Sequence, residues 1–133
     1  MVSSDRIEML LPCKAEYVSV ARLTVSGIAS RIGFDIETVE DIKVAVSEVC
    51  SRIISATDCQ DCHYTILFEI FADKLVIAFT SDMEKAKCIF DSDDDGLGMS
   101  IITAFMDKVE FCLENNYILT MTKTFEVISD DGI

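Results

Sequence analysis

Two side chains of opposite charge stand four residues apart in the middle of the chain. Glu48 carries a carboxylate, and Arg52 follows it about one helical turn later. A carboxylate can serve as a general base. A guanidinium this close would keep the carboxylate ionised and engaged in an ion pair, so the carboxylate would be a poor base. The pair therefore has two interpretations, part of a catalytic site or an intrahelical ion pair worth about 0.2–0.5 kcal/mol. We favour the ion pair.

The run Cys59-Gln60-Asp61-Cys62-His63 has the spacing C-x-x-C-H, which is typical of c-type haem attachment. A zinc site is a second possibility and would need a further ligand, such as Cys50 or Cys88. Haem attachment of this kind normally accompanies export, and the first residues lack the pattern of a secretory signal. A metal or haem module is therefore only an alternative. We expect His63 to begin a strand and the six cysteines to be reduced thiols.

A long helix expected over Asp35–Ala56 carries both Glu48 and Arg52. Asp35 is a suitable N-cap for it. Apolar residues recur at three- and four-residue spacing along one side, as in a helix with one buried face: Ile36, Val39, Ile42, Val46, Val49 and Ile53. We therefore expect Val46 and Val49 to be buried against a sheet.

Periodicity predicts further elements on both sides of this helix. One helix is expected near 14–32, ending at Gly33, and a short one near 96–106. Strands are expected at 6–11, 63–71, 74–80, 108–114 and 117–125, and the first ends at Pro12, as an edge strand can. Helices set apart from hairpins indicate an α+β fold, a two-layer sandwich with three helices on one face of a mixed, mostly antiparallel sheet. We expect a single domain over 1–133, with its core at about 6–125, a mobile loop over 82–95 and a disordered tail at 126–133.

The charge balance excludes several classes of partner. Twenty-four acidic and eleven basic residues give a net charge of −13. Such a surface does not suit nucleic acid, because phosphate binding needs basic side chains, and it would be repelled by an anionic membrane. No apolar stretch approaches the roughly 20 residues of a membrane helix, so a cytoplasmic location is expected. A basic protein partner would be attracted.

Five long runs carry a resemblance to a known family. They are IEMLLP, EYVSVARLTVSGIASRIGF, VEDIKVAVSEVC, GLGMSIITAFMDKVEF and LTMTKTF. Together they resemble the anti-sigma factor serine kinases of bacteria, the RsbW/SpoIIAB type, over about residues 6–125. The resemblance implies the GHKL ATPase fold, an antiparallel-rich sheet covered by three helices, in agreement with the periodicity. It also implies ATP and Mg²⁺ as cofactors, and a homodimer whose partners are a sigma factor and a STAS-type antagonist that the kinase phosphorylates on serine.

The metal and adenine motifs of that family are matched unequally here. Glu48 stands at the position of the general base, but Arg52 replaces the Asn that holds the magnesium ion. Arginine has no acceptor atom, so the metal site as the family builds it is absent. The adenine-binding Asp-x-Gly corresponds to Ser81 and Met83. A one-residue slip would place Asp82 at the Asp position, with the Gly still missing.

The turn Gly96-Leu97-Gly98 matches the family's Gly-rich phosphate motif. Backbone N–H groups at a helix N-terminus suit an anion, although the aspartates directly upstream would repel a triphosphate. A tight loop-to-helix turn is the alternative interpretation.

These residues together predict an anti-sigma regulatory factor that binds a sigma factor, an antagonist or both, with weakened or lost ATP binding and kinase activity. The alternative is an active serine kinase with a rearranged metal site. Arg22 is the candidate partner-binding residue, because basic residues are scarce and it stands on the first helix beside Ser19 and Ser26. An ordinary solvated side chain is the other interpretation of Arg22.

Overall fold

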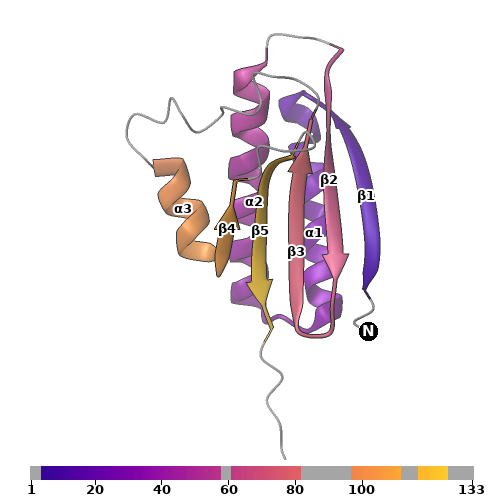
Figure 1. The fold of residues 1–133 in the computed structure, drawn as a ribbon, viewed down its shortest axis with the longest axis vertical. Helices are drawn as coiled ribbons and strands as arrows, with labels where there is room; N and C mark the ends of the chain where they lie inside the picture. The colour runs from indigo at the N-terminus through magenta and orange to yellow at the C-terminus, as the bar shows by residue number, and fades with distance from the viewer. Residues whose placement is uncertain (1–3, 58–60, 82–96, 112–116, 126–133) are drawn as a thin grey trace, which may run out of the picture.

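The computed structural model describes residues 4–57, 61–81, 97–111 and 117–125. Its elements follow one another along the chain as one strand, a 3₁₀ turn, two long helices, a hairpin, a short helix and two final strands (Figure 1). They are β1 (Asp5–Pro12), a 3₁₀ turn η1 (Ala15–Tyr17), α1 (Val18–Ile32), α2 (Ile36–Ala56), β2 (His63–Ile70), β3 (Lys74–Thr80), α3 (Leu97–Phe105), β4 (Lys108–Glu110) and β5 (Tyr117–Thr124).

The five strands form one sheet in the order β1-β2-β3-β5-β4. Each neighbouring pair is antiparallel, so the described sheet is wholly rather than mostly antiparallel. Figure 1 shows α1 and α2 side by side behind the sheet, with α3 next to α2 and β4. The predicted two-layer α+β sandwich is confirmed. Among the described helices, none has the length and apolarity to cross a membrane.

The core lies between the sheet and the long helices. Val46 and Val49 have no exposed surface, as predicted, and they share this interior with Phe68 and Phe79 of the sheet. Ile36 is the exception to the helical pattern, because 83% of its surface is exposed. It stands in the first turn of α2, and burial begins only one turn later, at Val39.

Both predicted caps are present. Asp35 caps α2, because its carboxylate accepts a hydrogen bond from the Thr38 N–H at 2.8 Å. Gly33 ends α1 with a φ of 117°, in the left-handed region that a residue without a side chain adopts at low cost. The ring of Phe125 covers this glycine and meets Phe34 edge-on, with ring centroids 5.3 Å apart.

The hairpins agree with prediction except in the length of β4. The predicted strand over 108–114 is found only as Lys108–Glu110, and 112–116 lie outside the described residues. The predicted loop over 82–95 and the tail at 126–133 also lie outside them.

A buried thiol leads to a prediction about alkaline pH. Burial raises the pKa of Cys50 from 9.0 to about 11, so the unfolded chain loses this proton at lower pH than the folded protein. The free energy of unfolding should therefore fall as pH rises from about 9 to 11, by up to about 1.4 kcal/mol per pH unit. Urea denaturation at several pH values measures this slope. The Cys50→Ala variant should show a shallower slope, and an equal one would assign the effect to other groups.

Candidate functional site

Glu48 and Arg52 meet on one side of α2. The Arg52 guanidinium donates through Nε to Glu48 Oε1 at 3.2 Å, and each side chain is 26% exposed. The predicted ion pair is therefore present. A salt bridge this exposed contributes little to stability, about 0–1 kcal/mol. The functional consequence of the pair is that Arg52 already donates a hydrogen bond to the Glu48 carboxylate.

The first turn of α3 packs directly onto this pair. Gly98 is buried, and a Cβ built on it would lie 2.7 Å from Arg52 Nη2 and 2.8 Å from Glu48 Oε1. Side-chain carbon atoms do not approach other atoms so closely, so any larger residue at this position would require the Glu48 or Arg52 side chain to move. We call Glu48, Arg52 and Gly98 together the Glu48 site.

Two of the other residues predicted for the nucleotide site lie on parts of the fold other than α2, and the rest lie outside the described residues. Ser81 follows β3, is only 6% exposed, and donates from its hydroxyl to the His63 carbonyl oxygen of β2 at 3.5 Å. Leu97 opens α3 and is 58% exposed. Asp82 and Gly96 lie outside the described residues. The structure thus brings together Glu48, Arg52 and Gly98, and it ties Ser81 to β2.

The donor set of the Glu48 site does not fit a magnesium ion. Mg²⁺ takes oxygen ligands in octahedral geometry, whereas Arg52 offers only N–H donors and a positive charge. Within the described part of the chain, no group of three or more His, Cys, Asp or Glu side chains could hold a metal ion. Beside Glu48 the structure therefore places a positively charged guanidinium and not a further oxygen ligand.

One cysteine of the C-x-x-C-H run is not the reduced thiol that the sequence predicted. Cys62 is disulfide-bonded, so the expectation of six reduced thiols is wrong there, while Cys13 and Cys50 are free. The expectation of reduced thiols came from the expected cytoplasmic location. Disulfide pairing depends instead on which sulfurs the fold brings together. A sulfur in a disulfide has no thiolate for zinc or haem, so the structure does not support this alternative. His63 begins β2, as predicted, and Cys59 lies outside the described residues.

Arg22 lies away from the core on α1 and is exposed. No ion pair or hydrogen bond joins its guanidinium to another side chain in the described ranges. A cation on this surface is available to a partner, as the sequence-based hypothesis requires.

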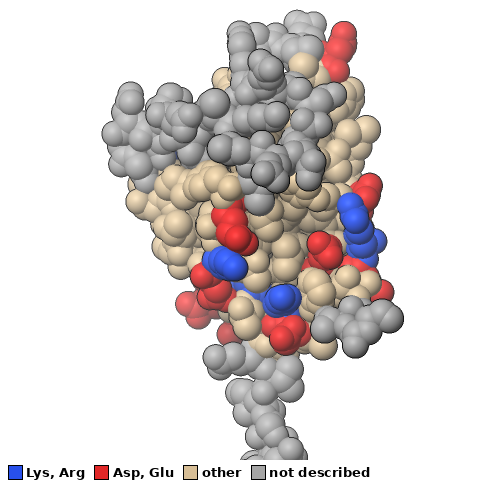
Figure 2. Space-filling view, in the orientation of Figure 1, with Lys and Arg blue, Asp and Glu red and all other residues tan. Residues whose placement is uncertain are grey.

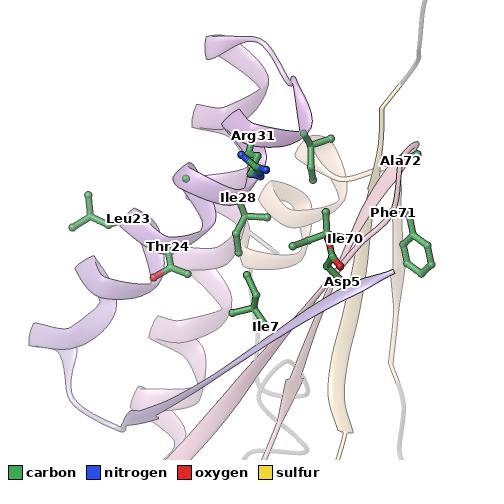
Figure 3. Close-up of a pocket in the computed structure, with 11 residues that line it drawn as sticks. Asp5, Ile7, Leu23, Thr24, Ile28, Arg31, Ile70, Phe71 and Ala72 are labelled. Atoms are coloured by element: carbon green, nitrogen blue, oxygen red, sulfur yellow. The ribbon is translucent and has the colours of Figure 1, made fainter. Parts of the chain in front are cut away.

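A groove that the sequence did not predict lies between α1 and the β1 side of the sheet (Figure 3). It has a volume of about 580 Å³. Its lining is mainly apolar and includes Leu23 and Ile28 of α1. In Figure 3, Ile28 lies between α1 and the sheet residues Ile7 and Ile70, and Leu23 lies on the outer side of α1. The sequence did contain one signal for this groove. Leu23 is an apolar residue that lies off the core-facing side of α1, and 73% of its surface is exposed.

Comparisons with known proteins agree with this architecture. Residues 11–123 match the model of the histidine kinase-like ATPase domain. The chain is 36% identical over 134 residues to the serine-protein kinase RsbW of Halalkalibacterium halodurans, covering 90% of this chain and 83% of that protein. It is 33% identical over 146 residues to RsbW of Bacillus cereus strain G9842, covering 96% and 91%. RsbW of Bacillus mycoides is 32% identical over 150 residues, covering 99% and 94%.

These matches extend over nearly the whole sequence and include both helices of the Glu48 site. They confirm the resemblance that the five sequence runs indicated. The chain therefore belongs to the family of histidine kinase-like ATPase domains, within its anti-sigma factor serine kinases of the RsbW type.

Proposed function

We propose that this protein is a cytoplasmic anti-sigma regulatory factor that acts by binding, with ATP binding and kinase activity weakened or lost. Its partners are a sigma factor, a STAS-type antagonist or both, and it works as a homodimer. The observation that carries the proposal is the hydrogen bond from the Arg52 guanidinium to Glu48. The resemblance assigns the position of Arg52 to the Asn that holds the magnesium ion.

Three properties of the Glu48 site weigh against catalysis. A general base must be free to accept a proton, and Glu48 already accepts a hydrogen bond from Arg52 at 3.2 Å. A magnesium ion would meet the positive charge of the guanidinium rather than an amide oxygen. A Cβ built on Gly98 would lie within 3 Å of both side chains, so α3 packs against the pair on the side where a hydrated cation would need room.

The binding role is supported by the surface of α1. Arg22 is an exposed cation on a protein with a net charge of −13. A guanidinium can hold a carboxylate through two parallel hydrogen bonds, which gives both orientation and affinity. We therefore place the partner contact on this helix and expect binding without ATP.

Arg22→Ala should weaken the partner complex by about 1–3 kcal/mol, roughly 5- to 150-fold, because a charged hydrogen-bond donor is lost at the interface. The partner is recovered from the source cells with tagged protein, identified by mass spectrometry, and titrated by calorimetry without ATP. Arg31→Ala is the matched control, since it removes the same charge from an exposed position on the same helix. Equal affinities for wild type and the Arg22 variant would remove Arg22 from the interface. Recovery of neither a sigma factor nor an antagonist would contradict the proposed function.

The second candidate function is an active serine kinase, which is favoured by the presence of Glu48 and by the printed names of the relatives. Incubating the recovered antagonist with the protein and ATP distinguishes the two. Stoichiometric serine phosphorylation within minutes would replace the binding-only proposal with this one.

A further inference from the structure

We propose that Cys13 and Cys62 form a thiol–disulfide exchange site, in which the Cys13 thiol displaces the present partner of Cys62. The exchange joins the end of β1 to the start of β2 by a covalent bond. This modification site goes beyond the proposed function and does not depend on it.

The two cysteines stand opposite each other at the end of the β1–β2 ladder, at the upper end of the sheet in Figure 1. The register pairs Pro12 with His63. The next pair along is therefore Cys13 with Cys62, and the N–H of Cys13 donates to the Cys62 carbonyl oxygen at 2.9 Å. Opposed Cα atoms at a hydrogen-bonded pair lie about 5.5 Å apart, within the range of about 4.4–6.8 Å that a disulfide spans.

The two side chains share one face of the sheet, the face that the helices cover. Opposed residues of antiparallel strands lie on the same face, and side chains alternate along each strand. Leu11 and Tyr64, the opposed pair two positions further into the ladder, are 5% and 1% exposed and belong to the core. Cys13 packs against the same core and forms a hydrogen bond with the side chain of Thr57, the C-cap of α2.

The two sulfurs are in the states that exchange requires. Cys13 is a free, partly buried thiol, whereas Cys62 is disulfide-bonded. In the exchange, the Cys13 thiolate attacks the Cys62 sulfur. A new S–S bond forms between them, the old S–S bond breaks, and the former partner leaves as a thiolate that takes up the proton lost by Cys13. One disulfide is broken for each one formed, so the step needs no oxidant or reductant.

The surroundings of Cys13 decide which sulfurs it attacks. Burial raises the pKa of its thiol, and the hydrogen bond with Thr57 offsets part of the rise, so little thiolate is present near neutral pH. On the face shown in Figure 2, the described Lys and Arg side chains lie low on the sheet and beside the middle of β1, and none lies at the upper end. Alignment with Cys62 compensates for the low thiolate fraction, because groups held in place react as an intramolecular pair.

The new bond would fix the entry to α1. The Lys14 N–H donates to the Pro12 carbonyl oxygen at 2.8 Å, and the Tyr17 N–H donates to the Lys14 carbonyl oxygen at 3.1 Å. A covalent bond at Cys13 would hold this short connection at its first residue. Amide hydrogen exchange over residues 14–18 should therefore be slower in the Cys13–Cys62 form than in the reduced protein. Equal exchange rates would overturn this effect on the helix.

Disulfide mapping of the full chain tests the exchange. The protein is equilibrated in a glutathione redox buffer, quenched with acid, alkylated, and digested with trypsin and an Asp-specific protease. Cleavage before Asp61 separates Cys62 from Cys59, so mass spectrometry identifies the sulfur bonded to Cys62. We expect a Cys13–Cys62 peptide in the wild type and none in Cys13→Ala. Cys50→Ala is the matched control, because it removes the other free thiol of the described residues and should leave this peptide unchanged.

Two-cysteine variants test the alignment. One chain keeps Cys13 and Cys62, the other keeps Cys50 and Cys62, and Ala replaces the remaining cysteines. The first should form its disulfide in glutathione buffer at least about tenfold faster, because only Cys13 stands opposite Cys62 in the register. Thermal melts check that both chains are folded.

Two results would overturn the inference: a wild type in which Cys62 never bonds to Cys13, or equal rates in the two-cysteine chains. Neither measurement involves nucleotide or a protein partner, which keeps this outcome separate from the proposed function. A chain that exchanges its disulfide and binds neither a sigma factor nor an antagonist would contradict only the proposed function.

Discussion

Val49→Asp is expected to lower the free energy of unfolding by about 4 kcal/mol, a large part of the 5–15 kcal/mol of an ordinary domain. Val49 has no exposed surface, and it lies on the side of α2 that faces the core. An aspartate there would lose its hydration without gaining a partner, which is among the most costly changes in a protein interior. Urea denaturation followed by circular dichroism measures the loss.

Val44→Asp is the matched control for this substitution. It makes the same chemical change on the same helix at a position that is 40% exposed, and it should cost about 1 kcal/mol or less. Val46→Asp should behave like Val49→Asp, since Val46 is equally buried. Similar midpoints for the Val49 and Val44 variants would show that the buried face of α2 is wrongly assigned.

Arg52→Asn is expected to increase the affinity for ATP with magnesium at least tenfold over a wild type that binds only in the millimolar range. The substitution removes the cation that occupies Glu48 and supplies an amide oxygen, which is a ligand that Mg²⁺ accepts. Calorimetric titration with ATP, in the presence and absence of magnesium, measures both proteins.

Arg52→Ala separates the two effects, because it frees Glu48 without supplying an oxygen. If Arg52→Asn and Arg52→Ala bind equally, the gain does not come from a restored metal ligand. If the wild type binds in the micromolar range and depends on magnesium, the proposed loss of ATP binding is contradicted.

The sequence predicted the parts of this protein that depend on local spacing. The bounds of α2 follow from the period of its apolar residues, and the Glu48–Arg52 contact follows from a four-residue separation in a helix. Ile36 fits the same period and is nevertheless exposed, because a periodic pattern does not show where the neighbouring layer begins.

Features that join distant segments were not predictable in the same way. The contact of Gly98 with the Glu48–Arg52 pair depends on how α3 docks against α2, almost fifty residues earlier in the chain. The position of β5 between β3 and β4 and the disulfide at Cys62 are likewise set by tertiary structure. A single sequence shows that a Gly-x-Gly turn exists, but it does not show what the turn packs against.

The strand order has a consequence for synthesis on the ribosome. β5 follows every other described element in the sequence, yet it lies inside the sheet, paired with both β3 and β4. A nascent chain that has not yet released Tyr117–Thr124 already holds the three described helices, but the edges of β3 and β4 that pair with β5 in the described sheet are still open. Long-range pairing of this kind is slow and leaves strand edges open to other chains. The described sheet is therefore completed only after β5 has emerged, although the helices that cover it are synthesised earlier.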